Sequence, residues 1–136
     1  MTDTRRALVA GVFYFAVVFA IAFVMGVART LILAAAPDVP RLAAVLVEAP
    51  ILVVASWFIC RRVVQRLNVP GQLGPRIIMG ATGFVFMLAA EIALSVLAGG
   101  RSIADLFALY ADPSHATGLA AQMIFAIIPL VQGRTP

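Results

Sequence analysis

The sequence contains no lysine, one cysteine and one histidine, and only 12% of its 136 residues are charged. A single cysteine, Cys60, excludes an intrachain disulfide. Cys60 and His115 alone fall short of the three or four ligands that a zinc site needs. The sequence also lacks the Gly-rich phosphate loop and the HExxH, CxxC and GxSxG motifs. We therefore expect no catalytic residue, no metal and no cofactor, and the sequence gives little support for an enzyme.

The basic residues are all arginines, ten in number, and they exceed the six acids to give a net charge of +4. A basic balance can indicate nucleic-acid binding, but here no stripe of basic residues with interleaved aromatics is present. The arginines instead stand at the ends of apolar runs. That distribution is typical of membrane topology signals, so we predict no nucleic-acid partner.

Long apolar runs dominate the sequence, in which 63% of the residues are hydrophobic. A transmembrane helix needs about 20 mostly apolar residues, and four segments reach that length: 7–36, 40–66, 75–98 and 113–132. The sequence therefore predicts an all-α chain, an integral membrane four-helix bundle that forms one transmembrane domain over residues 1–136. Its first partner is the lipid bilayer.

The first segment has some features of a secretory signal, with Arg5 and Arg6 ahead of an apolar run and small residues near its end. The run over 7–36 is much longer than the roughly 7–15 apolar residues of such a signal. We expect a retained helix.

A fifth, shorter helix is expected between the third and fourth long segments. Ser102 and Asp105 have the spacing of a capping box, and apolar residues follow. We predict a short helix lying in the membrane interface; an ordered loop is the alternative. The aromatic residues Trp57 and Tyr14 are expected near the inner interface and Tyr110 near the outer one.

The arginine distribution predicts the orientation of the bundle. With the N-terminus inside, two arginines, Arg41 and Arg101, lie outside, and seven lie inside: Arg5, Arg6, Arg61, Arg62, Arg66, Arg76 and Arg134. Positively charged loops stay in the cytoplasm. We therefore predict a multi-pass protein of the bacterial inner membrane with both termini cytoplasmic.

Three ionisable residues lie inside apolar segments: Arg29, Glu48 and Glu91. At about 1.5 Å per helical residue, each is roughly 10–12 Å from the outer end of its helix. Charges at such depth are costly and usually face the protein interior, where they pair. We predict a buried charge cluster of these three residues, with Gln122 and Ser95 as supporting polar side chains.

This cluster allows several interpretations. Buried ion pairs often serve only to specify helix packing, and Arg29 could instead extend outward to the lipid headgroups. Alternatively, Arg29 neutralises one carboxylate and leaves the other to carry a proton, as a proton-coupled carrier requires.

Several short stretches carry a resemblance: residues 26–31 (GVARTL), 48–50 (EAP), 56–57 (SW), and 61–62 (RR) followed by 69–70 (VP). In these the chain resembles small, uncharacterised four-helix inner-membrane proteins of proteobacteria. The resemblance implies a membrane location and no particular substrate. Because the loops are too short for a soluble catalytic domain, we expect a structural or accessory component of a larger membrane complex, or a self-associating protein. The alternative is a small proton- or ion-coupled carrier or channel that uses the charge cluster.

Overall fold

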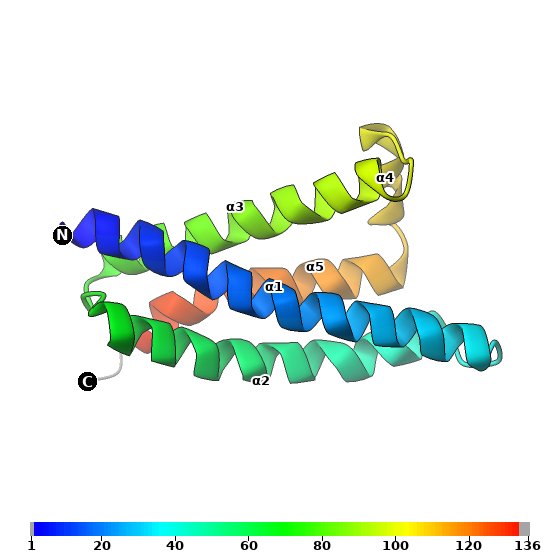
Figure 1. Ribbon diagram of the computed structural model, residues 1–136, viewed down its shortest axis with the longest axis horizontal. Coiled ribbons are helices and arrows are strands. Elements are labelled where there is room, and N and C mark those ends of the chain that lie inside the picture. Colours follow the sequence, from blue (N-terminus) through cyan, green and yellow to red (C-terminus); the bar gives the residue numbers. More distant parts are fainter. Residues whose placement is uncertain (1, 134–136) are drawn as a thin grey trace.

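The structure is a computed structural model that describes residues 2–133, and its regular structure there is entirely helical (Figure 1). Four long helices and one short helix follow one another along the chain: α1 (Asp3–Ala35), α2 (Arg41–Leu67), α3 (Leu73–Leu97), α4 (Ile103–Leu109) and α5 (Pro113–Gly133). The four long helices are each long and apolar enough to cross a membrane. The predicted all-helical chain with four long helices and a short one between the last two is confirmed.

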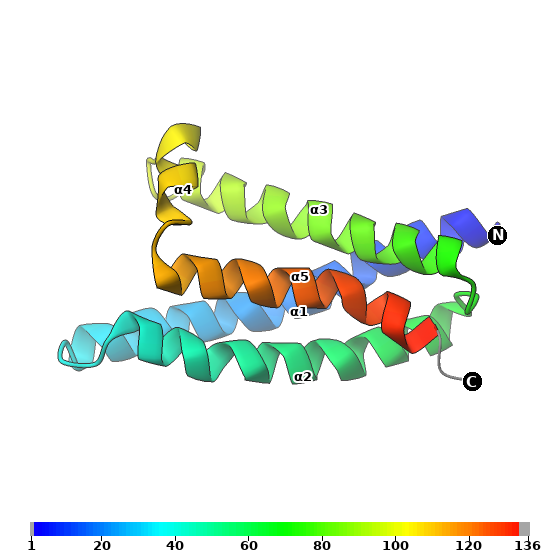
Figure 2. The same cartoon turned by 180° about the vertical axis from the view of Figure 1, so that it is seen from behind.

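The four long helices run side by side as an up-and-down bundle (Figures 1 and 2). Each packs against two neighbours, so that α1 contacts α2 and α3, and α5 contacts the same two helices from the opposite side. The start of α1, the α2–α3 connection and the end of α5 lie at one end of the bundle, which we call the terminal end. The short helix α4 and the α1–α2 connection lie at the other end, the α4 end, where α3 diverges from α1 and α2.

The first and last residues of the helices are set by capping hydrogen bonds and proline positions more than by where the apolar runs begin and end. Helix α1 begins at Asp3, four residues before the predicted start, because the Thr2 hydroxyl accepts a hydrogen bond from the Arg5 amide (3.3 Å) and caps it. Helix α3 begins at Leu73 rather than 75, so Gly74 and Pro75 lie in its first turn. Proline is tolerated there because that amide has no partner within the helix.

The connection through α4 is built from local signals. Ser102 and Asp105 form the predicted capping box, with each side chain 3.2 Å from the other residue's backbone nitrogen. These hydrogen bonds lower the pKa of Asp105, so the carboxylate stays ionised at neutral pH. Gly100, at the turn after α3, has a φ of 64°, a conformation that glycine adopts without steric cost.

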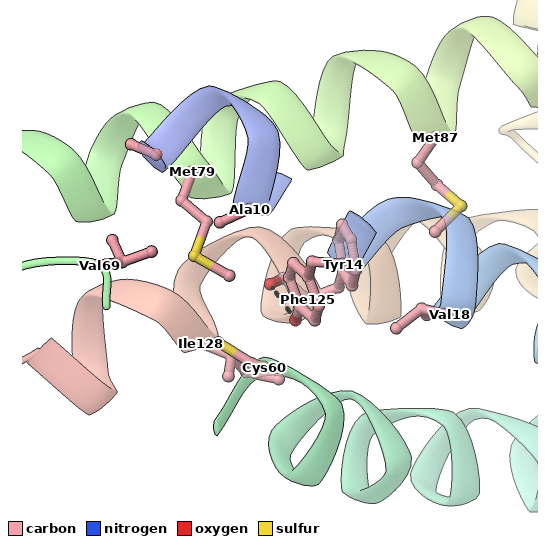
Figure 3. Close-up of a cluster of buried hydrophobic side chains, with 10 residues drawn as sticks. Ala10, Tyr14, Val18, Cys60, Val69, Met79, Met87, Phe125 and Ile128 are labelled. Carbon is pink, nitrogen blue, oxygen red and sulfur yellow. Dashed lines mark hydrogen bonds between the residues drawn. The ribbon is translucent and has the colours of Figure 1, made fainter. Parts of the chain in front are cut away.

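The helices approach most closely near the terminal end, where small residues face one another. An ideal Cβ on Gly11 of α1 would lie 2.7 Å from Thr82 Cβ of α3, and one on Gly80 of α3 would overlap the Ala126 carbonyl oxygen of α5. Small residues allow this close packing of helices. The core beside these crossings holds ten buried residues: Ala7, Ala10, Tyr14, Val18, Cys60, Val69, Met79, Met87, Phe125 and Ile128 (Figure 3).

Tyr14 is the centre of this core, and its predicted place in an interfacial belt is wrong. Its side chain is fully buried, and its ring stacks on Phe125 with 4.1 Å between the centroids. Its hydroxyl donates to the Phe125 carbonyl oxygen at 2.8 Å (Figure 3). That carbonyl lacks a helical donor because the residue four positions later is Pro129, which has no amide hydrogen. Buried Tyr14 therefore supplies the donor that the Phe125 carbonyl of α5 lacks. No pattern within α1 predicts this contact.

Arg76 ties the terminal end together, although the sequence indicated only a role in orientation. Its side chain is 5% exposed. Its guanidinium donates to the carbonyl oxygens of Pro70 (2.8 Å), Val69 (3.3 Å) and Pro129 (3.5 Å). A single side chain therefore links the α2–α3 connection to the kinked part of α5.

Candidate functional site

The candidate site is a cavity of about 960 Å³ in the half of the bundle towards the α4 end. It is lined by the C-terminal halves of α1 and α3, the N-terminal halves of α2 and α5, and by α4. The exposed residues Arg41 and Arg101 are among its lining, so it opens at the α4 end, and the exposed lining residues Phe23, Val27 and Leu31 show that it is also open along the side of the bundle. Val18, Met87 and Phe125 belong both to the lining and to the core, and they form its floor. The packed core closes the cavity towards the terminal end.

The ion pair of Arg29 and Glu48 lies on one wall of this cavity. Arg29 Nη1 of α1 donates to Glu48 Oε2 of α2, and the two side chains retain 23% and 12% of their exposure. The pair joins α1 to α2 on the α4 side of the packed core, where the two helices line the cavity. Arg29 is thus directed to a carboxylate within the bundle, and the alternative of extension to the headgroups does not describe its position.

Glu91 of α3 lies in the same cavity and has different partners. Its Oε2 accepts hydrogen bonds from Gln122 Nε2 of α5 at 3.0 Å and from Tyr110 Oη at 3.3 Å. Both donors are neutral groups. The three charged residues predicted as one cluster therefore lie in one cavity as two separate hydrogen-bonded groups, Arg29 with Glu48 and Glu91 with Gln122 and Tyr110.

Tyr110 is a site residue that sequence reasoning missed, since its place near the outer end was read as an aromatic anchor. It caps α4 and reaches back to Glu91, 19 residues earlier in the chain. Burial raises the pKa of Tyr110, and the Glu91 carboxylate raises that pKa further. The phenol therefore keeps its proton at neutral pH and can donate to the carboxylate. No local sequence signal indicates this contact, because it depends on how α4 folds over α3.

The remaining predicted residues are placed as follows. Gln122 supports Glu91, as its expected depth suggested. Ser95 lines the cavity, but its hydroxyl makes no hydrogen bond within residues 2–133. His115 also lines the cavity near its opening, with Nδ1 3.0 Å from Asp112 Oδ2. Arg29–Glu48 is the ion pair within residues 2–133, and the His115–Asp112 contact becomes a second one only when the imidazole is protonated.

The lining sets what the cavity can hold. Ligand sites in proteins typically span roughly 300–1,000 Å³ and combine apolar walls with a few convergent polar groups. This cavity matches that description, with several aromatic rings and one charged pair beside an unpaired carboxyl group. Its chemistry suits proton or cation binding more than covalent catalysis, because no nucleophile–base pair lies in it among the described residues.

Comparison of the chain with protein-family models, with curated proteins and with solved structures gives no match.

Proposed function

We propose that the protein is a multi-pass protein of the bacterial inner membrane. Outward-facing side chains on all four long helices are large and apolar, for example Val24 (66% exposed), Val47 (66%), Val85 (62%) and Ile127 (51%). Soluble monomers rarely expose so many large apolar side chains together, whereas a lipid environment removes the cost of exposing them. The charge distribution supports both termini in the cytoplasm, with the α4 end outside.

The orientation is tested by labelling cysteines in intact cells. Asp38→Cys lies in the α1–α2 connection and Arg66→Cys near the end of α2, and both positions are exposed, whereas the native Cys60 is buried. A membrane-impermeant maleimide added from the periplasmic side should label position 38 and leave position 66 unlabelled. Labelling of position 66 alone would reverse the orientation.

We further propose that the protein acts as a small proton- or ion-coupled carrier. The observation that carries this proposal is the cavity around Arg29, Glu48 and Glu91, which is open towards the α4 end and closed by the core towards the terminal end. Charges that only specify helix packing need no space beside them. A carrier does need a binding space within the membrane, with access from one side at a time. The accessory role favoured by the sequence alone is thus the second candidate.

Neutralising Glu91 should abolish coupled transport. In liposomes with an imposed pH gradient and inorganic and organic cations present for exchange, the wild-type protein should move protons, and Glu91→Gln should lower the initial rate at least tenfold because the amide cannot bind and release a proton. Flux is followed with an entrapped pH-sensitive dye. Asp38→Asn is the matched control, since it removes an exposed acid at the same end that does not line the cavity.

Two results would contradict the carrier proposal. One is proton flux no faster than in protein-free liposomes. The other is wild-type flux in Glu91→Gln. An accessory component would instead show no flux and would co-purify with a partner at fixed stoichiometry in mild detergent.

A further inference from the structure

The cavity contains hydrogen-bond acceptors that the chain leaves without donors. Gln122 Oε1 is buried and has no partner within residues 2–133. The amide orientation is set by its neighbour, because Nε2 is the only atom of the group that can donate to the Glu91 carboxylate. A buried acceptor without a donor costs free energy of about 1–3 kcal/mol. This amide therefore has an unsatisfied acceptor, and a turn of the Gln122 side chain towards the cavity would bring Oε1 within reach of an N–H or O–H group of a ligand.

Glu91 also has an oxygen that accepts no hydrogen bond from the described residues. Both of its hydrogen bonds fall on Oε2, so Oε1 accepts none from the described part of the chain. Its donors, Tyr110 and Gln122, are neutral, and no ion-pair partner balances its charge among residues 2–133. A partly buried carboxylate in apolar surroundings is stabilised by a cation.

The other charged groups around the cavity are engaged or exposed. Arg29 is paired with Glu48, and His115 is paired with Asp112. Arg41 and Arg101 are exposed at the opening. None of these side chains donates a hydrogen bond to Glu91 or forms an ion pair with it within residues 2–133.

The walls of the cavity suit an apolar molecule. The rings of Phe19, Phe23 and Phe125 line the cavity with aliphatic side chains between them. Aromatic faces attract organic cations and also pack against hydrocarbon. These side chains offer too few oxygen ligands for a bare metal ion, because hard cations need about six.

We propose that Glu91 and Gln122 bind a protonated organic amine with an apolar body. The ammonium group donates to Glu91 Oε1 and, once the Gln122 side chain turns Oε1 towards the cavity, to that atom as well, and the apolar body lies against the aromatic rings of the lining. This inference rests on the proposed carrier function in that it names the substrate class, namely lipophilic amines exchanged against protons. An amine and a proton can compete for the same carboxylate, which is how exchange would be coupled.

The test measures binding with three probes that share one apolar body. The full chain in nanodiscs is titrated with 4-phenylbutylamine, with 4-phenylbutanol and with the trimethylated ammonium analogue, and heat from empty nanodiscs is subtracted. The amine should bind saturably at one site. The alcohol should bind at least tenfold more weakly because it lacks charge. The trimethylated analogue, which has charge and no N–H donor, should fall between them.

Variants separate the two acceptors. Glu91→Gln should weaken amine binding at least tenfold, and Asp38→Asn should leave it unchanged. Gln122→Met should weaken the amine while leaving the trimethylated analogue unaffected, since that analogue makes no hydrogen bond to the amide.

Equal affinity for amine and alcohol would overturn the inference, and so would unchanged amine binding in Glu91→Gln. If Glu91→Gln does not fold, the three probes on the wild-type protein decide. Amine binding without amine-dependent proton flux would reject the carrier function and retain this site. Proton flux without amine binding would retain the carrier and reject the amine as its substrate.

Discussion

Gly80→Ala should lower the free energy of unfolding by about 2–3 kcal/mol, the usual cost of overpacking a well-packed core. The added methyl group would overlap the Ala126 carbonyl oxygen and would lie 3.3 Å from the carbonyl carbon. These are backbone atoms of a helix, so they cannot rotate away as a side chain would. Helices α3 and α5 would have to separate, which displaces Phe125 from its contacts with Tyr14.

The loss is measured by SDS-induced unfolding in mixed micelles, in which the helices persist and only their packing is lost. Gly118→Ala in α5 is the matched control, because nothing lies within 4 Å of an added Cβ there. Alanine is a better helix former than glycine by about 0.5–1 kcal/mol, so the control should be unchanged or slightly more stable. Equal stability of the two variants would show that α3 and α5 do not cross closely at Gly80.

Arg76→Met should lower the free energy of unfolding by about 3 kcal/mol. Methionine keeps the apolar stem but removes the guanidinium that donates to the carbonyl oxygens of Val69, Pro70 and Pro129. Each buried carbonyl left without a donor costs about 1–3 kcal/mol, and Pro129 O at 3.5 Å contributes least. The lost link should also expose the α2–α3 connection, so proteolysis within residues 68–72 should become faster.

Arg62→Met is the control for this variant, because Arg62 is exposed near the same end of the bundle. Its stability should stay within about 0.5 kcal/mol of wild type. Arg76→Lys should recover only part of the loss, since one ammonium group lacks the planar fork that reaches several acceptors. Wild-type stability of Arg76→Met would show that the guanidinium does not stabilise the terminal end.

Sequence patterns predict the elements of this fold well because their causes are local. Four apolar runs of sufficient length indicate four long helices, and the Ser102–Asp105 spacing indicates α4 through its own capping box. The boundaries moved by a few residues where a cap decided them, as at Thr2. Depth is likewise local, since counting residues from the helix ends placed Arg29, Glu48 and Glu91 in one layer, and all three line one cavity.

Local sequence patterns do not predict which side chains on different helices contact one another. The sequence predicted three charges together, but only the tertiary structure assigned Arg29 to Glu48 and left Glu91 with Gln122 and Tyr110. The choice depends on which helices are neighbours and on the fold of α4 over α3.

By itself, then, the sequence determined the number of helices, their lengths and the depth of the charged residues, because hydrophobicity, capping and helical rise act within each segment. Tertiary structure alone decided that Tyr14 is buried beneath the carbonyl that Pro129 leaves free, and that Arg76 joins three carbonyls. It also decided that the helices pack tightly at one end and enclose a cavity at the other. These features arise from shape complementarity between segments distant in sequence, and the small residues that permit it, such as Gly80, gain meaning only beside the helix they face.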